Sequence, residues 1–358
     1  MGEQFDTLED VATKLRESTK KVQILFAHNG TGKTRLSRFF KEAGQNGEQS
    51  DTLYFNAFTE DLFHWDNDLE HDTTRVLELK ESKFFKVFDG EGYDIQNLVR
   101  GFLNRYADFM FDIDTSTRKV SFSREVANGD NTETIENIKV SRGEENIFIW
   151  SFFLAVAQLA IDNHEDYDWV KYIYIDDPIS SLDDNNVITV ASHLAKLIRD
   201  SNGKKFIIST HHGLFYNVLF NELKGAEKYL LTKDKQNNKY KLETLKNDTP
   251  FYQHIAILKD LYELSQNGTI YTYHFNLLRN ILEKTAAFHG FDKFSDCIKV
   301  EDDDIDRIIH TRRINILSHG NYSIFEPVEM QEENKEHFKK ILENFISEYK
   351  FNDTLFTQ

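Results

Sequence analysis

The chain has 358 residues, a formal net charge of −17 and one cysteine. That length allows about two domains that fold without disulfide bonds. The acidic balance disfavours a protein that coats DNA through a basic surface, although it leaves room for RNA bound in a local basic pocket. The single thiol, Cys297, fits a reducing compartment, and we expect it to be a buried structural residue and not a nucleophile.

The sequence shows no sign of secretion and no segment that we expect to span a membrane. Residues 1–10 carry acidic side chains and no apolar stretch, so we expect no secretory signal. The longest apolar run, residues 147–161, is interrupted by Ser151 and Gln158 and is shorter than a bilayer span. We therefore expect a cytoplasmic protein with no membrane partner.

The most specific motif follows the apolar run Val22 to Phe26, which predicts a buried strand. The next eight residues, AHNGTGKT, precede a helical pattern. A loop of this kind binds phosphate through its backbone N–H groups and the N-terminus of the following helix. We expect Lys33 to reach the β- and γ-phosphates and the Thr34 hydroxyl to ligate Mg²⁺. The residues that we expect to bind the nucleotide here are Asn29, Gly30, Thr31, Gly32, Lys33, Thr34 and Arg35.

Two further apolar segments predict buried parallel strands that end in polar residues. Residues 172–178, YIYIDDP, place Asp176 to hold Mg²⁺ and Asp177 to orient an attacking water. Residues 206–211, FIISTH, end in His211. Taken alone, the acidic pair also fits a turn after a strand, and a histidine at a strand end is usually structural.

Two shorter patterns complete the series. Ser141, Gly143 and Glu144 precede the helical stretch 147–161. The tetrapeptide SSLD at residues 180–183 comes directly after the predicted strand and acidic pair at residues 172–178. A serine with a glutamate three residues later is also a capping box, so the first pattern could serve only to cap a helix. Along the chain, the five patterns occur in the order 27–34, 141–144, 172–178, 180–183 and 206–211, and such a series is hard to obtain by chance.

In this order the motifs resemble the ABC-type ATPase head, an α/β fold shared by transporter motors and by SMC and Rad50 proteins. The further residues that the resemblance assigns to nucleotide binding are Ser141, Gly143 and Glu144 of the signature, Asp183 of the D-loop and the switch histidine, His211. It also implies a homodimer or a higher homo-oligomer, because the signature serine caps a nucleotide on the other subunit.

Three departures from that pattern concern individual positions. Ala27 replaces the first glycine of the loop, which is tolerated if its φ is negative. Asp177 replaces the usual glutamate, so hydrolysis is expected to be slow or to need activation. Asn56, within residues 54–58, is the candidate for the Q-loop glutamine.

The rest of the chain argues against the two best-known uses of such a head. About a hundred residues separate Lys33 from Ser141 without sustained heptads, which disfavours a DNA-tethering machine with coiled-coil arms. A transporter motor is disfavoured because more than a hundred residues of different character follow the head.

A different pattern begins after a predicted hairpin at residues 229–245. Thr249-Pro250 indicates a boundary that divides the chain into domains 1–250 and 251–358. Apolar residues then recur at spacings of three and four, which predicts a small α-helical bundle. The predicted helices span residues 255–264, 273–288, 305–318 and 335–349.

Three polar residues of this bundle are candidates for chemistry. Arg279 and Glu283 are four apart and therefore share one helical face. His319 precedes Gly320-Asn321, a helix stop, and a helix C-terminus favours a charged imidazole, which suits proton transfer near neutrality. Each residue alone also fits an ordinary surface ion pair or a favourable partner of the helix dipole.

Together with the head, these residues resemble the PrrC anticodon nuclease family, in which an ABC-type NTPase head is fused to a HEPN-like helical ribonuclease domain. Residues 29–38, 56–62 and 176–186 carry most of the resemblance. It implies cleavage of a tRNA, typically a lysine tRNA, in its anticodon loop, giving a 2′,3′-cyclic phosphate and a 5′-OH without a metal at the RNA. The implied catalytic residues are Arg279, Glu283 and His319.

The resemblance also implies ATP or GTP with Mg²⁺ as cofactor, with room for another regulatory nucleotide. A type I restriction–modification complex would be the silencing partner, and the role would be antiviral.

Arg313 or Arg312 is the second choice for the catalytic arginine, because HEPN nucleases show Arg-x₄₋₆-His. The main alternative is an ABC-type ATPase of a defence or DNA-repair complex whose helical tail only binds a partner. A binding module with an inactive loop is disfavoured because Lys33, Thr34 and Asp176 are present.

Overall fold

The computed structural model divides the chain into two compact units, Met1–Lys246 and Asn247–Gln358, which are described separately. The described residues are 2–47, 50–56, 63–67, 75–80, 94–128, 131–178, 184–234, 239–245, 252–268, 270–298, 330–349, 351 and 356. The expected boundary at Thr249-Pro250 lies outside them.

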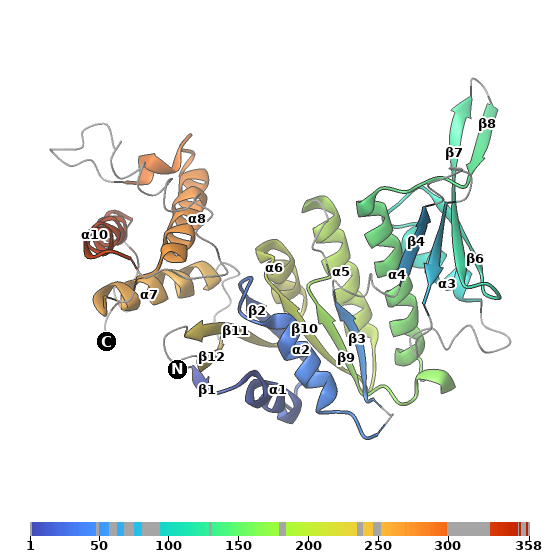
Figure 1. The fold of residues 1–358 in the computed structure, drawn as a ribbon, viewed down its shortest axis with the longest axis horizontal. Helices are drawn as coiled ribbons and strands as arrows, with labels where there is room; N and C mark the ends of the chain where they lie inside the picture. The colour runs from blue at the N-terminus through green and yellow to red at the C-terminus, as the bar shows by residue number, and fades with distance from the viewer. Residues whose placement is uncertain are drawn as a thin grey trace. The chain divides into compact units, whose positions relative to one another are not determined.

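The first unit is built on a seven-stranded mixed sheet in the order β1-β12-β11-β2-β10-β9-β3 (Figure 1). Its strands are β1 (Glu3–Phe5), β2 (Val22–Ala27), β3 (Thr52–Asn56), β9 (Tyr172–Asp176), β10 (Lys205–Thr210), β11 (Glu227–Asp234) and β12 (Lys239–Thr244). The strands from β11 to β3 in this order are parallel, whereas β12 and β1 run antiparallel to their neighbours. The three apolar segments predicted as buried strands are inner strands of this sheet, and the predicted hairpin is β11 and β12.

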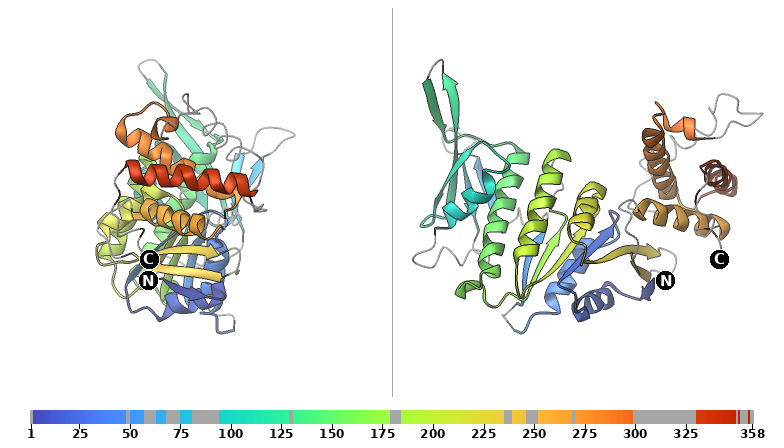
Figure 2. Two further views of the ribbon diagram at one scale, coloured as in Figure 1. Left: turned by 90° about the vertical axis from the view of Figure 1, so that its left-hand side faces the viewer. Right: turned by 180° about the vertical axis from the view of Figure 1, so that it is seen from behind.

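Helices cover both faces of the sheet (Figures 1 and 2). On one face lie α1 (Leu8–Glu17) and α2 (Lys33–Glu42); the other face carries α4 (Arg142–Ile161), α5 (Asp184–Asp200), α6 (Gly213–Glu222) and, after α4, the short 3₁₀ helix η3 (Glu165–Tyr167). Leu25 and Ala27 of β2 belong to the core formed with α1 and α2, whereas the ring of Phe26 contacts that of Tyr216 in α6. Burial on both faces explains why these strands are continuously apolar.

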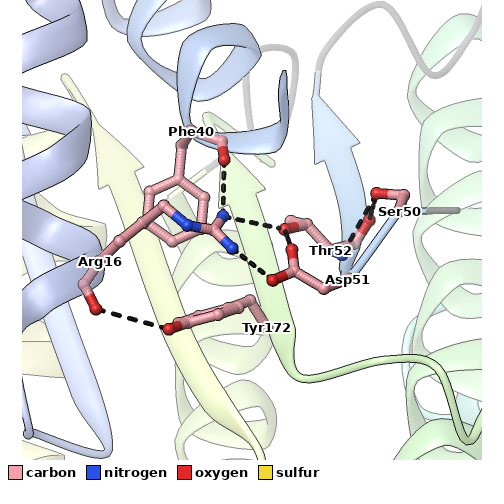
Figure 3. A network of polar contacts seen from close by, with 6 residues as sticks. All are labelled: Arg16, Phe40, Ser50, Asp51, Thr52 and Tyr172. Atoms are coloured by element: carbon pink, nitrogen blue, oxygen red, sulfur yellow. Dashed lines mark hydrogen bonds and ion pairs between the residues drawn. The ribbon is translucent and has the colours of Figure 1, made fainter. Parts of the chain in front are cut away.

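Arg16 of α1 joins both helices of one layer to the amino ends of two strands (Figure 3). Its Nη1 donates to the carbonyl of Phe40 at 2.6 Å, and its Nη2 pairs with Asp51, the residue before β3. The guanidinium carbon lies 4.6 Å and 4.5 Å from the ring centroids of Phe40 and Tyr172. A Cβ at Gly44 would collide with the Asp51 carboxylate, so any larger residue there would force this ion pair to shift.

The part of the chain between β3 and β9 forms a second, antiparallel sheet. Its strands follow the order β4-β5-β7-β6, and β8 pairs with β7. Their bounds, with those of the helix between them, are β4 (Phe63–Asn67), β5 (Arg75–Leu79), α3 (Ile95–Leu103), β6 (Met110–Asp114), β7 (Lys119–Asn128) and β8 (Asn131–Glu136). Phe111 and Phe122 of this sheet pack edge-on against Phe148 of α4. The described residues between Lys33 and Ser141 thus form short strands and one helix after α2, in the region where the absence of heptads had disfavoured coiled-coil arms.

Helix α4 is longer than the apolar run had indicated. It spans 20 residues and is, among the described residues, the one helix long and apolar enough to cross a membrane by length and composition. The apolar run at residues 147–161 is the C-terminal part of this helix, and the added length comes from residues 142–146, which precede the run. Because 83% of its most apolar window is buried inside the protein, α4 has the burial of a core helix.

The second unit is helical in its described part. It contains α7 (Tyr252–Gln266), α8 (Thr272–His289), the short 3₁₀ helix η4 (Phe294–Cys297) and α10 (Glu332–Glu348). Phe275, Leu282 and Phe338 are fully buried in its core. Cys297 is buried as predicted and donates to the carbonyl of Leu282 at 3.6 Å. The helix predicted at residues 305–318 lies outside the described residues.

Candidate functional site

The register of the parallel strands brings the polar strand ends of the first unit to one edge of the sheet. Asp176 at the end of β9 stands opposite Ser209 of β10 and Asn56 of β3, and Thr210 stands opposite Phe26 of β2. In open α/β sheets, ligands bind at the carboxyl ends of the strands. The loop after β2, the acidic pair and the candidate Q-loop residue therefore share that edge.

The loop between β2 and α2 has the backbone that anion binding requires. Gly30 and Gly32 have φ values of 80° and 104°, a region that residues with a side chain rarely adopt. Gly32 immediately precedes α2, whose first N–H groups have no partner within the helix and face the loop. Ala27 is the last residue of strand β2, so an extended backbone accommodates alanine in place of glycine.

Lys33, the first residue of α2, is buried beneath this loop with an exposed fraction of only 6%. Its Nζ lies 3.1 Å from Asp177 Oδ2 and donates to the carbonyl of Ala27 at 3.2 Å and to Asn29 Oδ1 at 3.3 Å. Protein oxygens thus hold the ammonium at the loop. Phosphate oxygens could take the place of those oxygens, because an anionic acceptor makes a stronger hydrogen bond to the ammonium than a neutral carbonyl does.

Asp176 and Thr34 form the part of the site that fits a divalent cation. Thr34 Oγ1 donates to Asp176 Oδ2 at 3.0 Å, and Ser209 Oγ donates to Oδ1 at 2.6 Å. Burial, with the nearby Asp177 charge, raises the pKa of Asp176 to about 6 against the opposing effect of its hydroxyl donors and of Lys33. A hydroxyl beside a carboxylate offers the hard oxygen ligands that Mg²⁺ prefers. Among the described residues, no group of three histidine, cysteine or acidic side chains is arranged to hold a metal ion by itself, so phosphate oxygens would have to complete the coordination of Mg²⁺ here.

Asp177 joins Lys33 to His211. Its Oδ1 accepts from the backbone N–H of His211 at 2.9 Å, and its Oδ2 lies 2.8 Å from His211 Nδ1. Burial opposes ionisation of Asp177, but the hydrogen bonds from His211 and the charge of Lys33 outweigh it and lower its pKa. Its φ of 48° is uncommon for a residue with a side chain and aims the carboxylate at these partners. The structure thus brings together three residues that the motifs placed far apart in sequence.

The signature residues lie around the start of α4. Ser141 is its N-cap, and the reciprocal bonds with Glu144 form the capping box, with the Ser141 N–H donating to Glu144 Oε2 at 2.7 Å. Glu144 also pairs with Arg124 of β7. A pocket of about 600 Å³ opens beside Ser141 and Gly143 and is also lined by Arg105, and none of its lining residues belongs to the phosphate loop.

In the second unit, α8 carries the predicted pair. Arg279 Nε donates to Glu283 Oε1 at 2.7 Å, and the guanidinium carbon lies 5.2 Å from the ring centroid of Phe294. The Glu283 side chain is 46% exposed. The remaining residues of the predicted sites, His319, the alternatives Arg312 and Arg313, and Asp183 of the head, lie outside the described residues.

Two contributors were missing from the motif analysis. Ser209 holds Asp176 from the neighbouring strand, and Tyr54 connects Ser37 of α2, at 2.7 Å, to Asn56, at 2.9 Å. The sequence could have identified Ser209 as a candidate. It is two residues before His211, and alternate residues of a strand point to the same face of the sheet. The pairing of β9 with β10, which brings it to Asp176, is a tertiary contact.

Comparison with known proteins adds a family match. A family described as AAA domain matches residues 125–347. The anticodon nuclease of Escherichia coli is 38% identical over 344 residues, covering 86% of this chain and 84% of that protein. An uncharacterized chromosomal cassette protein of Staphylococcus aureus is 28% identical over 165 residues, covering 42% of this chain and 22% of its own. Among solved structures, the SMC head domain from Thermotoga maritima aligns with a TM-score of 0.35 and 12% identity over 63% of this chain and 91% of that one.

Proposed function

The chain belongs to the anticodon nuclease family, and from that membership we propose that it is an endoribonuclease that cleaves a tRNA in its anticodon loop under the control of a bound nucleotide. The observation that carries the nuclease part of the proposal is the 38% identity over 86% of this chain to the anticodon nuclease, and the strand-end cluster of the first unit supports the nucleotide control. There Lys33, Asp177 and His211 form one chain of contacts beside Asp176. Lysine tRNA is the expected substrate.

In the first unit, ATP or GTP binds over the loop of residues 27–34. The loop N–H groups and Lys33 would bind its phosphates, and Thr34 and Asp176 would hold Mg²⁺, whose charge would offset that of the phosphate oxygens. Asp177 orients water at the terminal phosphate and accepts its proton, because the groups around it keep it ionised. His211 holds the Asp177 carboxylate in place. In a dimer, Ser141 caps the nucleotide bound to the other subunit.

In the second unit, cleavage proceeds by acid–base chemistry at the RNA. The 2′-oxygen forms a bond to the adjacent phosphorus while the bond from phosphorus to the 5′-oxygen breaks, which leaves a 2′,3′-cyclic phosphate and a 5′-OH. His319 transfers the proton, and Arg279 stabilises charge on the non-bridging oxygens. Glu283 orients Arg279, which its 2.7 Å contact supports. Unpaired anticodon bases suit such a site, because they can be splayed and read at their edges.

The proposal includes a biological setting, which rests on the resemblance to the anticodon nuclease family. A type I restriction–modification complex holds the nuclease silent in the cytoplasm, and its failure during phage infection releases cleavage and stops translation. The competing function is an ABC-type ATPase of a defence or DNA-repair complex whose helical unit only binds a partner. The Arg279–Glu283 pair, whose side chains are 20% and 46% exposed, is also compatible with that role.

Cleavage of cellular tRNA tests the proposal. Wild type and His319→Ala are expressed with the exposed control variant Lys259→Ala, and tRNA is analysed on gels and by the chemistry of its ends. We expect cyclic phosphate and 5′-OH ends with wild type and with the control, and intact tRNA with His319→Ala. Intact tRNA with released wild-type protein that still turns over nucleotide would favour the ATPase with a partner-binding tail.

Nucleotide control is tested separately with Lys33→Ala. Because Lys33 is the buried cation of the loop, we expect this variant to lose nucleotide binding and the nucleotide dependence of cleavage. Unchanged regulation of cleavage in Lys33→Ala would contradict the gating role of the first unit while leaving the nuclease role in place.

A further inference from the structure

The pocket of about 600 Å³ beside the signature is lined by an arginine whose charge no carboxylate offsets. Three of its lining residues are charged, namely Arg105, Asp108 and Glu144. Both acids pair with Arg124 of β7, Asp108 at a distance of 3.3 Å. Arg105 itself forms no ion pair within the described part of the chain. The pocket that contains Ser141 therefore also presents an uncompensated positive charge.

Hydrogen bonds before and after Arg105 fix its backbone. Its N–H donates to the carbonyl of Phe102 at 3.2 Å, and its guanidinium carbon lies 5.6 Å from the ring centroid of the same residue. The N–H of Tyr106 donates to the carbonyl of Leu103 at 2.8 Å, and its hydroxyl shares a hydrogen bond of 2.9 Å with Nδ1 of His193 in α5. The Arg105 side chain is exposed. It can therefore meet a ligand without a rearrangement of the backbone.

The pocket lies apart from the residues that would hold the nucleotide of the same copy. Its lining residue Asn186 is in the first turn of α5, which follows β9 at the edge of the sheet where that strand ends. However, Lys33, Asp176 and Asp177 are not among the lining residues. A guanidinium offers a planar fork of N–H donors that matches phosphate oxygens. The phosphate that fits this pocket is one that a second copy of the chain would bring.

The dimer of the proposed function, on which this inference rests, supplies such a phosphate. In that dimer Ser141 caps the nucleotide bound to the other subunit. Because Ser141 and Arg105 line one pocket, a phosphate that reaches the hydroxyl also comes within reach of the guanidinium. The contact is reciprocal in a symmetric dimer, so each nucleotide would meet the arginine of the other copy.

We propose that Arg105 of one copy contacts the terminal phosphate of the nucleotide bound to a second copy and stabilises the transition state of its hydrolysis. In this step the water oxygen forms a bond to the terminal phosphorus, the bond from phosphorus to the bridging oxygen breaks, and Asp177 accepts a proton from the water. Arg105 binds the phosphoryl oxygens on which negative charge is spread. Hydrolysis that is slow with an aspartate in place of glutamate thus gains its activation when two copies meet.

Turnover of ATP and of GTP by the full chain tests the role of the residue. Loss of an arginine that acts on a phosphoryl group from another subunit is expected to lower turnover by about 10³-fold in Arg105→Ala. Arg100→Ala is the matched control, because it removes an exposed arginine of α3 whose Nη1 lies 3.4 Å from Asn97 Oδ1. We expect this control to keep the wild-type turnover.

Mixed dimers show whether Arg105 acts on the other copy. Two variants with different affinity tags are expressed together and purified through both tags. Lys33→Ala combined with Arg105→Ala keeps one complete site of two, so about half of the wild-type turnover is expected. Wild type combined with the double variant Lys33→Ala/Arg105→Ala keeps no complete site and is expected to be inactive. Arg105→Gln replaces Arg105→Ala in both mixtures if the alanine variant folds poorly.

The outcomes separate this inference from the function on which it rests. Wild-type turnover in Arg105→Ala, or no turnover in the first mixture, overturns the inference. Activity in the second mixture alone would show that Arg105 serves its own copy, which overturns it as well. Wild type that hydrolyses neither nucleotide contradicts hydrolysis by the first unit together with this inference. Intact tRNA with mixed dimers that behave as expected would contradict the nuclease proposal alone.

Discussion

The polar sites of the two units are built in opposite ways. In the first unit, Lys33 and Asp176 are 6% and 2% exposed, and their hydrogen-bond and ion-pair partners come from three parallel strands, the residues that follow them and a helix start. In the second, Arg279 and Glu283 are one turn apart on a helix above an apolar core, and their side chains are 20% and 46% exposed, so it is the carboxylate that is solvated. Buried charges need their partners, so removing one costs stability, whereas a helix-surface pair can be changed with little effect on folding.

Arg279→Ala tests the surface half of that comparison and carries the largest expected effect. Loss of a group that stabilises transition-state charge is expected to lower tRNA cleavage by about 10²- to 10³-fold. The free energy of unfolding should fall by only about 1 kcal/mol or less, because the pair with Glu283 is partly solvated. Cleavage assays and denaturant unfolding of the same preparation measure both. A loss of cleavage that merely tracks unfolding would remove the contrast.

Arg16→Met tests the buried half with the same residue type. Its ion pair with Asp51 is mostly buried, and its guanidinium lies against the rings of Phe40 and Tyr172. We expect the first unit to lose about 2 to 3 kcal/mol of unfolding free energy, because Asp51 keeps its charge without its partner. Denaturant unfolding measures this, with Arg38→Met as the control on the exposed pair with Glu42. Equal stability of the two variants would contradict the comparison.

Asp176→Asn sharpens the comparison through pH. The pKa of Asp176 rises from 3.8 to about 6 in the folded chain, chiefly through burial, so between these values the folded state binds more protons than the unfolded state. Stability without nucleotide therefore falls as pH rises from about 4 to about 6, by about 2 to 3 kcal/mol for this group. Asp176→Asn should gain that amount over wild type above about pH 6 and lose the advantage near pH 4.

Chemical unfolding at a series of pH values, in the absence of Mg²⁺ and nucleotide, measures this difference. Asp177→Asn is the matched control and should differ in the opposite direction, because the pKa of Asp177 is lowered in the folded state. A difference between Asp176→Asn and wild type that does not change with pH would contradict the assignment.

Lys14→Gln is expected to have the smallest effect and sets the baseline for a solvated ion pair. Lys14 Nζ lies 3.0 Å from Glu3 Oε1, with side-chain exposures of 39% and 60%, and the hydrogen bond and charge of Glu3 raise the pKa of Lys14. We expect a change in unfolding free energy below about 0.5 kcal/mol that disappears in high salt. A larger, salt-independent loss would show that exposure alone does not separate the two kinds of pair.

The local sequence pattern determined the phosphate loop, the strand before it and the helix after it. It also determined the strands that end at Asp176 and Thr210, the helix that carries Arg279 and the C-terminal helix α10. Each of these depends on residues near one another in sequence, so periodicity and turn chemistry suffice to predict them. Sequence analysis could also place Ser141 and Glu144 at a helix start, since a capping box spans only four residues.

Tertiary structure decided what those elements meet. The second sheet pairs β5 with β7 across about forty residues, and Arg16 reaches Asp51 and Tyr172 through the packing of α1 on α2. Ser209 reaches Asp176, and Asp6 reaches Lys239, only because of strand order and register. These contacts join segments that are separated by tens to hundreds of residues, and no local pattern specifies which strand becomes the neighbour of which.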